Sequence, residues 1–111
     1  MRLSDVKGER VFEVIATIID PIASIALDEE VAKMFKREAL PEGMTAWQFF
    51  LTRAREALPA LIRGHKDDLC IILAAIGDTT VEEYVDGLSL DKFISDVIGL
   101  LTDGDFRGFF E

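Results

Sequence analysis

The sequence predicts an all-α protein that forms a single compact domain of about six or seven short helices. Apolar residues recur at the i, i+3, i+4, i+7 spacing of a helix face, and Gly, Pro and helix-capping residues punctuate these segments at short intervals. No stretch alternates apolar and polar residues for long enough to predict a strand. A chain of 111 residues can bury one core but is too short for a second domain.

The first helix is expected to begin after Ser4, a residue type that caps helices, and to end near residue 20. Proline lacks an amide hydrogen and disfavours helix in the residue before it, so Asp20-Pro21 should interrupt or end this helix. Residues 22–27 can form another short piece. The predicted apolar face of the first helix includes Val11, Phe12, Ile15, Ile18 and Ile19.

The sequence of the middle of the chain predicts a helix cap, a turn and then the clearest helix of the protein. Asp28 should cap a short segment that turns Val31, Met34 and Phe35 inward, and residues 40–43 form a turn. Thr45-x-x-Gln48 is a capping box, and the stripe after it predicts one buried face: Trp47, Phe50, Leu51, Ala54 and Leu58. Pro59 either kinks this helix or starts a new one that leads to Gly64.

The last 45 residues predict three more helices. Residues 67–76 are apolar nearly all round, which is typical of a central helix. Thr80-x-x-Glu83 is a second capping box, and Ser89 should cap the helix after it. The apolar face of that later helix has the i, i+3, i+4, i+7, i+11 spacing: Leu90, Phe93, Ile94, Val97 and Leu101.

Composition excludes several classes of function. The formal net charge is −9, and residues 67–111 carry most of the acids, so no basic stripe is present for binding nucleic acid. The longest uncharged apolar stretch, Leu69 to Gly77, is far shorter than the ~20 residues of a membrane span, and no signal-type run follows the N-terminus. We therefore expect a soluble, unexported protein that contacts neither nucleic acid nor a membrane.

No motif for catalysis, a cofactor or a metal is present. Cys70 lies in an apolar run that would raise its pKa, which is typical of a small core residue and not of a nucleophile. His65 follows Gly64 at an expected helix start, where capping or solvent exposure explains it, with a ligand or pH-switch role as the alternative. Acidic pairs begin helices, where carboxylates complement the helix dipole. We predict no catalytic residue, no cofactor and no metal.

Aromatic residues outside the predicted faces are the candidates for binding a partner protein. Phe49 falls opposite Trp47 on a helical wheel, so either a neighbouring helix covers it or it is an exposed aromatic. We expect residues 1–102 to form the helical domain and residues 103–111 to form an aromatic tail that either packs on this domain or meets another chain. The candidate partner-binding residues are Trp47, Phe49, Phe50, Phe106, Phe109 and Phe110, although core positions explain Trp47 and Phe50 as well.

Short phrases over nearly the whole chain carry a resemblance. They are VKGERVF at 6–12, DPIA at 20–23, FKR at 35–37, LPEGMT at 40–45, LPALI at 58–62, GHK at 64–66, VEEY at 81–84 and LLTD at 100–103. In phrasing and spacing the chain resembles the small tail assembly chaperones of Firmicutes siphophages and prophages. The resemblance implies a cytoplasmic, non-catalytic protein that binds the tape measure protein, keeps it soluble, helps recruit tail tube subunits and is absent from the mature virion.

Two other functions stay open at this point. The chain could be a small acidic adaptor that binds a host protein, or an inhibitor whose carboxylates mimic nucleic acid, for which the acids of residues 67–111 are the candidates. Exposed apolar faces would also favour self-association into a homo-oligomer.

Overall fold

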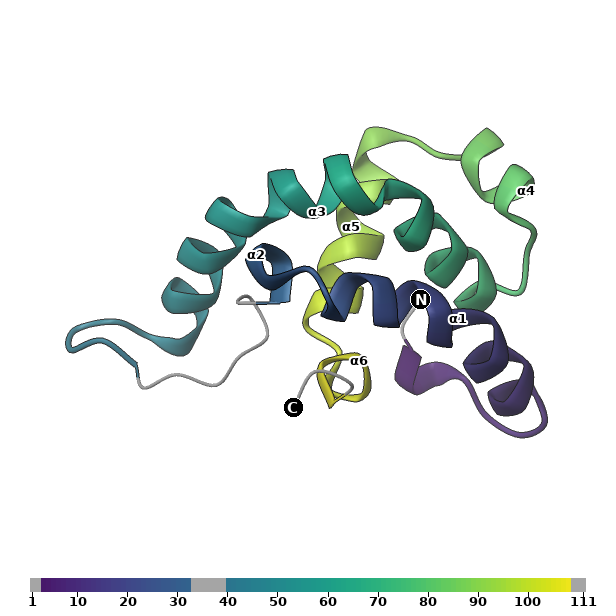
Figure 1. The fold of residues 1–111 in the computed structure, drawn as a ribbon, viewed down its shortest axis with the longest axis horizontal. Coiled ribbons are helices and arrows are strands. Elements are labelled where there is room, and N and C mark those ends of the chain that lie inside the picture. The colour runs from purple at the N-terminus through teal and green to yellow at the C-terminus, as the bar shows by residue number, and fades with distance from the viewer. Residues whose placement is uncertain (1–2, 33–39, 109–111) are drawn as a thin grey trace.

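The structure is a computed structural model that describes residues 3–32 and 40–108. These residues form helices and no strand, in the order η1 (Leu3–Asp5, a 3-10 helix), α1 (Arg10–Ala26), α2 (Glu29–Ala32), α3 (Ala46–Ile76), α4 (Val81–Asp86), α5 (Leu90–Leu101) and α6 (Gly104–Gly108), as Figure 1 shows. The prediction of an all-α single domain is confirmed. With 31 residues, α3 is longer than the short helices expected.

Capping residues begin three of these helices where the sequence places them. The Thr45 hydroxyl accepts the Gln48 N–H at 3.1 Å, and the Gln48 side-chain carbonyl accepts the Thr45 N–H at 3.0 Å. Thr80 and Ser89 also accept the N–H three residues further on, at 3.1 and 3.2 Å. Each cap satisfies an amide that the first helical turn leaves without a partner. The predicted starts of α3, α4 and α5 are therefore confirmed.

The predicted break near residue 20 is wrong, because Pro21 lies inside α1 and the helix continues to Ala26. A proline within a helix removes one backbone hydrogen bond. Here the Pro21 ring is buried together with Ile18 and Ile22 on the side of α1 that packs on α3. Burial of this continuous apolar side offsets the lost bond.

The buried face of α1 is rotated from the predicted one. Its buried side chains are Val14, Ile18, Pro21, Ile22 and Ile25, whereas Phe12, Ile15 and Ile19 are exposed. The periodicity predicted a wide apolar side of this helix, and α1 has one, but α3 covers only part of it. The rest of this side therefore faces solvent.

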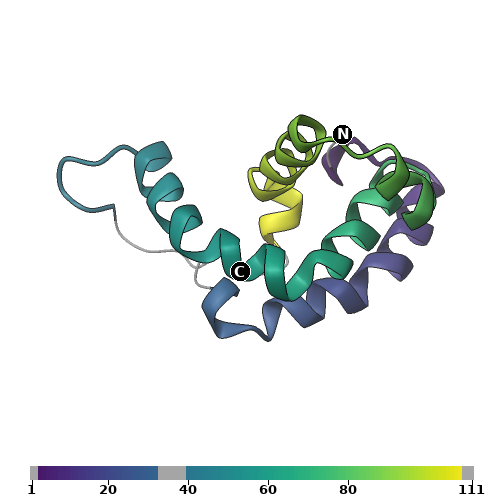
Figure 2. The same cartoon turned by 90° about the horizontal axis from the view of Figure 1, so that it is seen from above.

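The long helix α3 changes direction at His65, whose backbone angles (φ −132°, ψ 25°) are not helical. Pro59, which the sequence suggested as the kink, lies within the preceding regular segment. We call residues 46–64 the arm, because Figures 1 and 2 show that the start of α3 projects from the other helices. The chain measures 43 × 28 × 23 Å.

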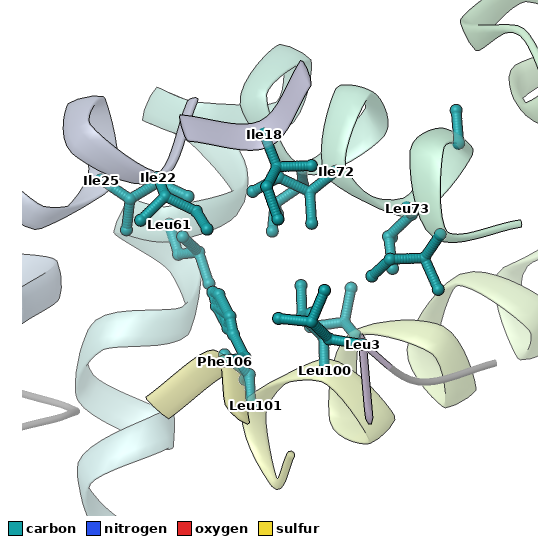
Figure 3. Close-up of a cluster of buried hydrophobic side chains, with 14 of the residues drawn as sticks. Leu3, Ile18, Ile22, Ile25, Leu61, Ile72, Leu73, Leu100, Leu101 and Phe106 are labelled. Carbon is teal, nitrogen blue, oxygen red and sulfur yellow. The ribbon is translucent and has the colours of Figure 1, made fainter. Parts of the chain in front are cut away.

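The core lies where the second part of α3, α1 and α5 meet. Figure 3 shows side chains from both ends of the chain in this cluster, with Leu3 beside Leu100 and the Phe106 ring directed from α6 toward Leu61 at the base of the arm. Leu61, Leu100 and Phe106 are each 1% exposed. Helix α6 therefore packs as part of the domain, and its aromatic ring supports the arm.

Candidate functional site

The distal arm carries apolar side chains that the described helices leave partly uncovered. Trp47 is 52% exposed and Leu51 is 46% exposed, one helical turn apart on the same side of α3. Phe50 and Leu58 are half-buried against the core. The prediction that this stripe is one buried face is therefore wrong for Trp47 and Leu51, because the start of α3 projects beyond the other described helices (Figure 2).

Ring contacts hold the aromatic residues of the arm in fixed positions. The rings of Trp47 and Phe50 stack with their centroids 5.5 Å apart and their planes at 19°. The guanidinium of Arg107, from α6, lies 5.7 Å from the centre of the Phe50 ring. Phe50 thus links the arm to α6, and Trp47 extends the same aromatic surface outward.

Phe49 lies on another side of the arm, as the helical wheel predicts. Its side chain is half-buried, and the guanidinium carbon of Arg53 lies 5.3 Å from the centre of its ring. Arg55 and Arg63 on the arm are exposed. The arm is therefore an apolar helix with basic side chains on a protein whose net charge is −9.

The structure corrects one candidate from the C-terminal tail. Phe106 is 1% exposed, so its ring fills the core and offers no free surface to a partner protein. Among residues 103–108 the tail folds back on the domain, because α6 packs on η1 and α5. Phe109 and Phe110 lie outside the described residues.

Further exposed apolar side chains lie on the body, and the sequence patterns had assigned several of them to buried faces. On α5, Ile94 is 48% exposed although its spacing predicted a core position. The most exposed of these side chains are Leu27, Phe12 and Leu90. Single exposed apolar residues are common in proteins, so the projection of the arm, and not exposure alone, distinguishes Trp47 and Leu51.

The surroundings of His65 differ from those that the sequence predicted. Its side chain is buried, where solvent exposure was one expectation. Its Nε2 lies 2.8 Å from Oδ2 of Asp28, between α1 and α2, and its Nδ1 lies 2.9 Å from Oδ2 of Asp68 in α3. Only the spacing to Asp68 is visible in the sequence, because Asp28 is 37 positions away.

The two carboxylates decide the charge of the His65 ring. Burial is the strongest single effect and lowers the pKa of His65, but the hydrogen bonds to Asp68 and Asp28 and the attraction of their charges together outweigh it. The pKa of His65 therefore lies above its usual value of 6.5. The pKa of Asp28 lies below its usual 3.8, chiefly because of the hydrogen bond to His65.

Open grooves lie on the body, away from the distal arm. A groove of about 490 Å³ runs between α1, the end of α3 and the start of α4, where Arg10 donates hydrogen bonds to the carbonyl oxygens of Ala75 (3.4 Å) and Ile76 (2.9 Å). A more apolar groove of about 430 Å³ lies between η1, α1 and α6. Within the described residues, no three His, Cys, Asp or Glu side chains are arranged to hold a metal ion.

Comparisons with known proteins give no family for this chain. No protein-family model, no curated protein and no solved structure matches it. Across residues 3–32 and 40–108, none of the helices combines the length and apolar character needed to span a bilayer.

Proposed function

We propose that this chain is a tail assembly chaperone of a phage or prophage, which binds and solubilises the tape measure protein and helps recruit tail tube subunits during virion morphogenesis. The observation that carries the proposal is the exposed side of Trp47 and Leu51 on an arm that projects from an acidic body. The chain acts by binding, without catalysis. It works in the host cytoplasm and is absent from the mature virion.

Elementary energetics support a binding role for this side of the arm. Burying apolar surface contributes about 25 cal/mol per Å², and tryptophan is enriched among the residues that dominate protein interfaces. A long apolar partner can lay the apolar face of an amphipathic helix on such a surface. The net charge of −9 on the chain then opposes aggregation of the complex through mutual repulsion.

Some of the phrases that carry the resemblance lie in or next to the arm. The phrases LPEGMT (40–45), LPALI (58–62) and GHK (64–66) lead into the arm, form its base and contain its kink. Three of the eight phrases that carry the resemblance therefore lie next to the exposed apolar side in the sequence. This agreement supports a shared binding role.

Co-expression tests the proposal. The chain is produced together with the long apolar protein encoded downstream of its gene, and the soluble, co-purifying fraction of that protein is measured. We expect the wild-type chain to increase this fraction. Leu51→Glu should weaken binding at least about tenfold, the effect of about 1.4 kcal/mol, and so reduce the increase. Leu90→Glu is the matched control, because Leu90 is also exposed but lies on α5.

Three results would count against the proposal. An insoluble partner in the presence of the wild-type chain would overturn the chaperone function and favour the acidic adaptor or nucleic-acid mimic. Equal losses from Leu51→Glu and Leu90→Glu would overturn the assignment of binding to the arm. Detection of the chain in purified virions by mass spectrometry would contradict its absence from the finished particle.

A further inference from the structure

The His65 cluster, which consists of His65, Asp28 and Asp68, joins three parts of the fold. His65 occupies the non-helical position between the arm and the rest of α3, and Asp68 lies in the next turn of the same helix. Asp28 accepts the N–H groups of Glu30 and Val31 through Oδ1 while its Oδ2 contacts His65. One carboxylate thus caps α2 and holds the kink of α3.

The geometry requires a protonated ring. An imidazole that contacts one carboxylate through Nδ1 and another through Nε2 must donate at both nitrogens, and only the imidazolium has two N–H donors. A neutral ring can donate to one carboxylate but turns a lone pair toward the other. Asp28 and Asp68 are the charged groups that act on the ring, while Glu29 and Glu30 of the adjacent α2 are exposed.

The backbone at the kink departs from helical geometry between two packed positions, Leu61 and Leu69. His65 interrupts the helical geometry, and the preceding Gly64 adds backbone freedom, with open space where a Cβ would be. Packing of Leu61 toward Phe106 limits how far the base of the arm can turn (Figure 3). A change in the backbone angles of His65 therefore moves chiefly the distal end of the arm, and it requires the contact between Arg107 and Phe50 to shift as well.

We propose that the His65 cluster is a proton-controlled latch that sets the direction in which the arm presents Trp47 and Leu51. With the ring protonated, both carboxylates are bound and the arm is fixed as observed. Loss of one proton places a lone pair against a carboxylate, which releases Asp28 and frees the arm to turn. The conformational step stands without the proposed function, whereas its effect on partner capture rests on it.

The expected movement can be measured directly between two labels. Thr52→Cys on the arm and Ser95→Cys on α5, both at exposed positions, are labelled in a Cys70→Ala background, and their separation is followed by fluorescence energy transfer from about pH 5 to about pH 9. Thr52 lies about 20 Å from His65 at 1.5 Å per residue, so a turn of about 15° moves it by about 5 Å. NMR of the only histidine follows ring protonation in the same samples.

Two single-atom changes separate the latch from general effects of charge. The side-chain amide introduced by Asp28→Asn can still cap α2 through its oxygen and can donate its N–H to a neutral Nε2. This variant should therefore hold the arm in place when the ring is neutral, and so remove the change in label separation that the wild type shows as pH rises through the pKa of His65. Asp67→Asn is the matched control, because the exposed Asp67 neighbours Asp68 but does not act on the ring. The control should behave like the wild type.

Three results would overturn the latch. They are a constant label separation while the ring titrates, a ring that stays doubly protonated over the whole range, and an unchanged pH response in Asp28→Asn. None of these results involves the tape measure protein. Failure of the latch is therefore distinguishable from failure of the proposed chaperone function.

Discussion

Asp103 accepts two hydrogen bonds from Ser4, one from its backbone N–H (2.9 Å) and one from its hydroxyl (3.2 Å), across 99 positions of sequence. The sequence suggested that Ser4 would cap the first helix, but its hydroxyl serves this long-range contact and α1 begins at Arg10. The other carboxylate oxygen accepts the N–H of Asp105 at 3.0 Å. The fully buried Asp103 thus fastens η1 to the start of α6.

Asp103→Ala should lower the free energy of unfolding by about 2–3 kcal/mol, because it removes the hydrogen bonds to a charged, buried carboxylate together with the cap of α6. Urea denaturation followed by circular dichroism measures the change. Asp105→Ala is the control, since Asp105 is exposed and should cost at most about 1 kcal/mol through the helix dipole. Equal losses in the two variants would contradict the role given to Asp103.

Phe106→Ala should lower the free energy of unfolding by about 3–5 kcal/mol, because it leaves a cavity beneath the arm. Phe12→Ala removes the same ring from a side chain that is 75% exposed, and should cost less than about 1 kcal/mol. The difference between the two denaturation midpoints measures the burial of Phe106. A small loss in Phe106→Ala would show that α6 does not pack as observed.

The His65 cluster should make stability depend on pH in two ranges. The pKa of His65 is raised in the fold, so its contribution is fully present below pH 6.5 and is lost as pH rises through the higher pKa. The pKa of Asp28 is lowered, so its contribution is present above pH 3.8 and is lost as pH falls through the lower pKa. Together these two groups favour greatest stability between pH 3.8 and pH 6.5.

Urea denaturation at a series of pH values tests this dependence. The unfolding free energy of the wild type should fall above pH 6.5, and the fall should be much smaller in His65→Gln, which cannot titrate. His65 is the only histidine, so no other imidazole confuses the comparison. A wild-type stability that rises through this range would contradict the raised pKa.

Local signals in the sequence predicted the helix starts but not the surroundings of the helices. Thr45, Thr80 and Ser89 act on amides within three residues, so their caps are readable without the rest of the fold. The periodic stripe at Trp47 and Leu51 locates an apolar side, yet it does not say whether another helix covers that side. Whether another helix covers an apolar side depends on tertiary packing. The distal arm projects beyond the other described helices, so Trp47 and Leu51 stay partly exposed.

Long-range contacts explain the remaining differences. Pro21 would end an isolated helix, but packing on α3 keeps α1 continuous. The surroundings of His65 depend on Asp28, whose distance in the sequence gives no local signal. Of the candidate residues, Trp47 therefore lies at the surface and Phe106 in the core. Periodicity alone does not predict either position, because both depend on long-range packing.

The stacked pair of Trp47 and Phe50 also gives the protein a natural optical reporter. Trp47 is the only tryptophan in the chain, so the indole emission comes entirely from the arm. The only tyrosine, Tyr84, is buried on α4 and donates its hydroxyl hydrogen to Asp96 (2.8 Å). The emission wavelength and quenching of the unmodified chain therefore describe solvent contact at one end of the molecule, separately from the folding of its body.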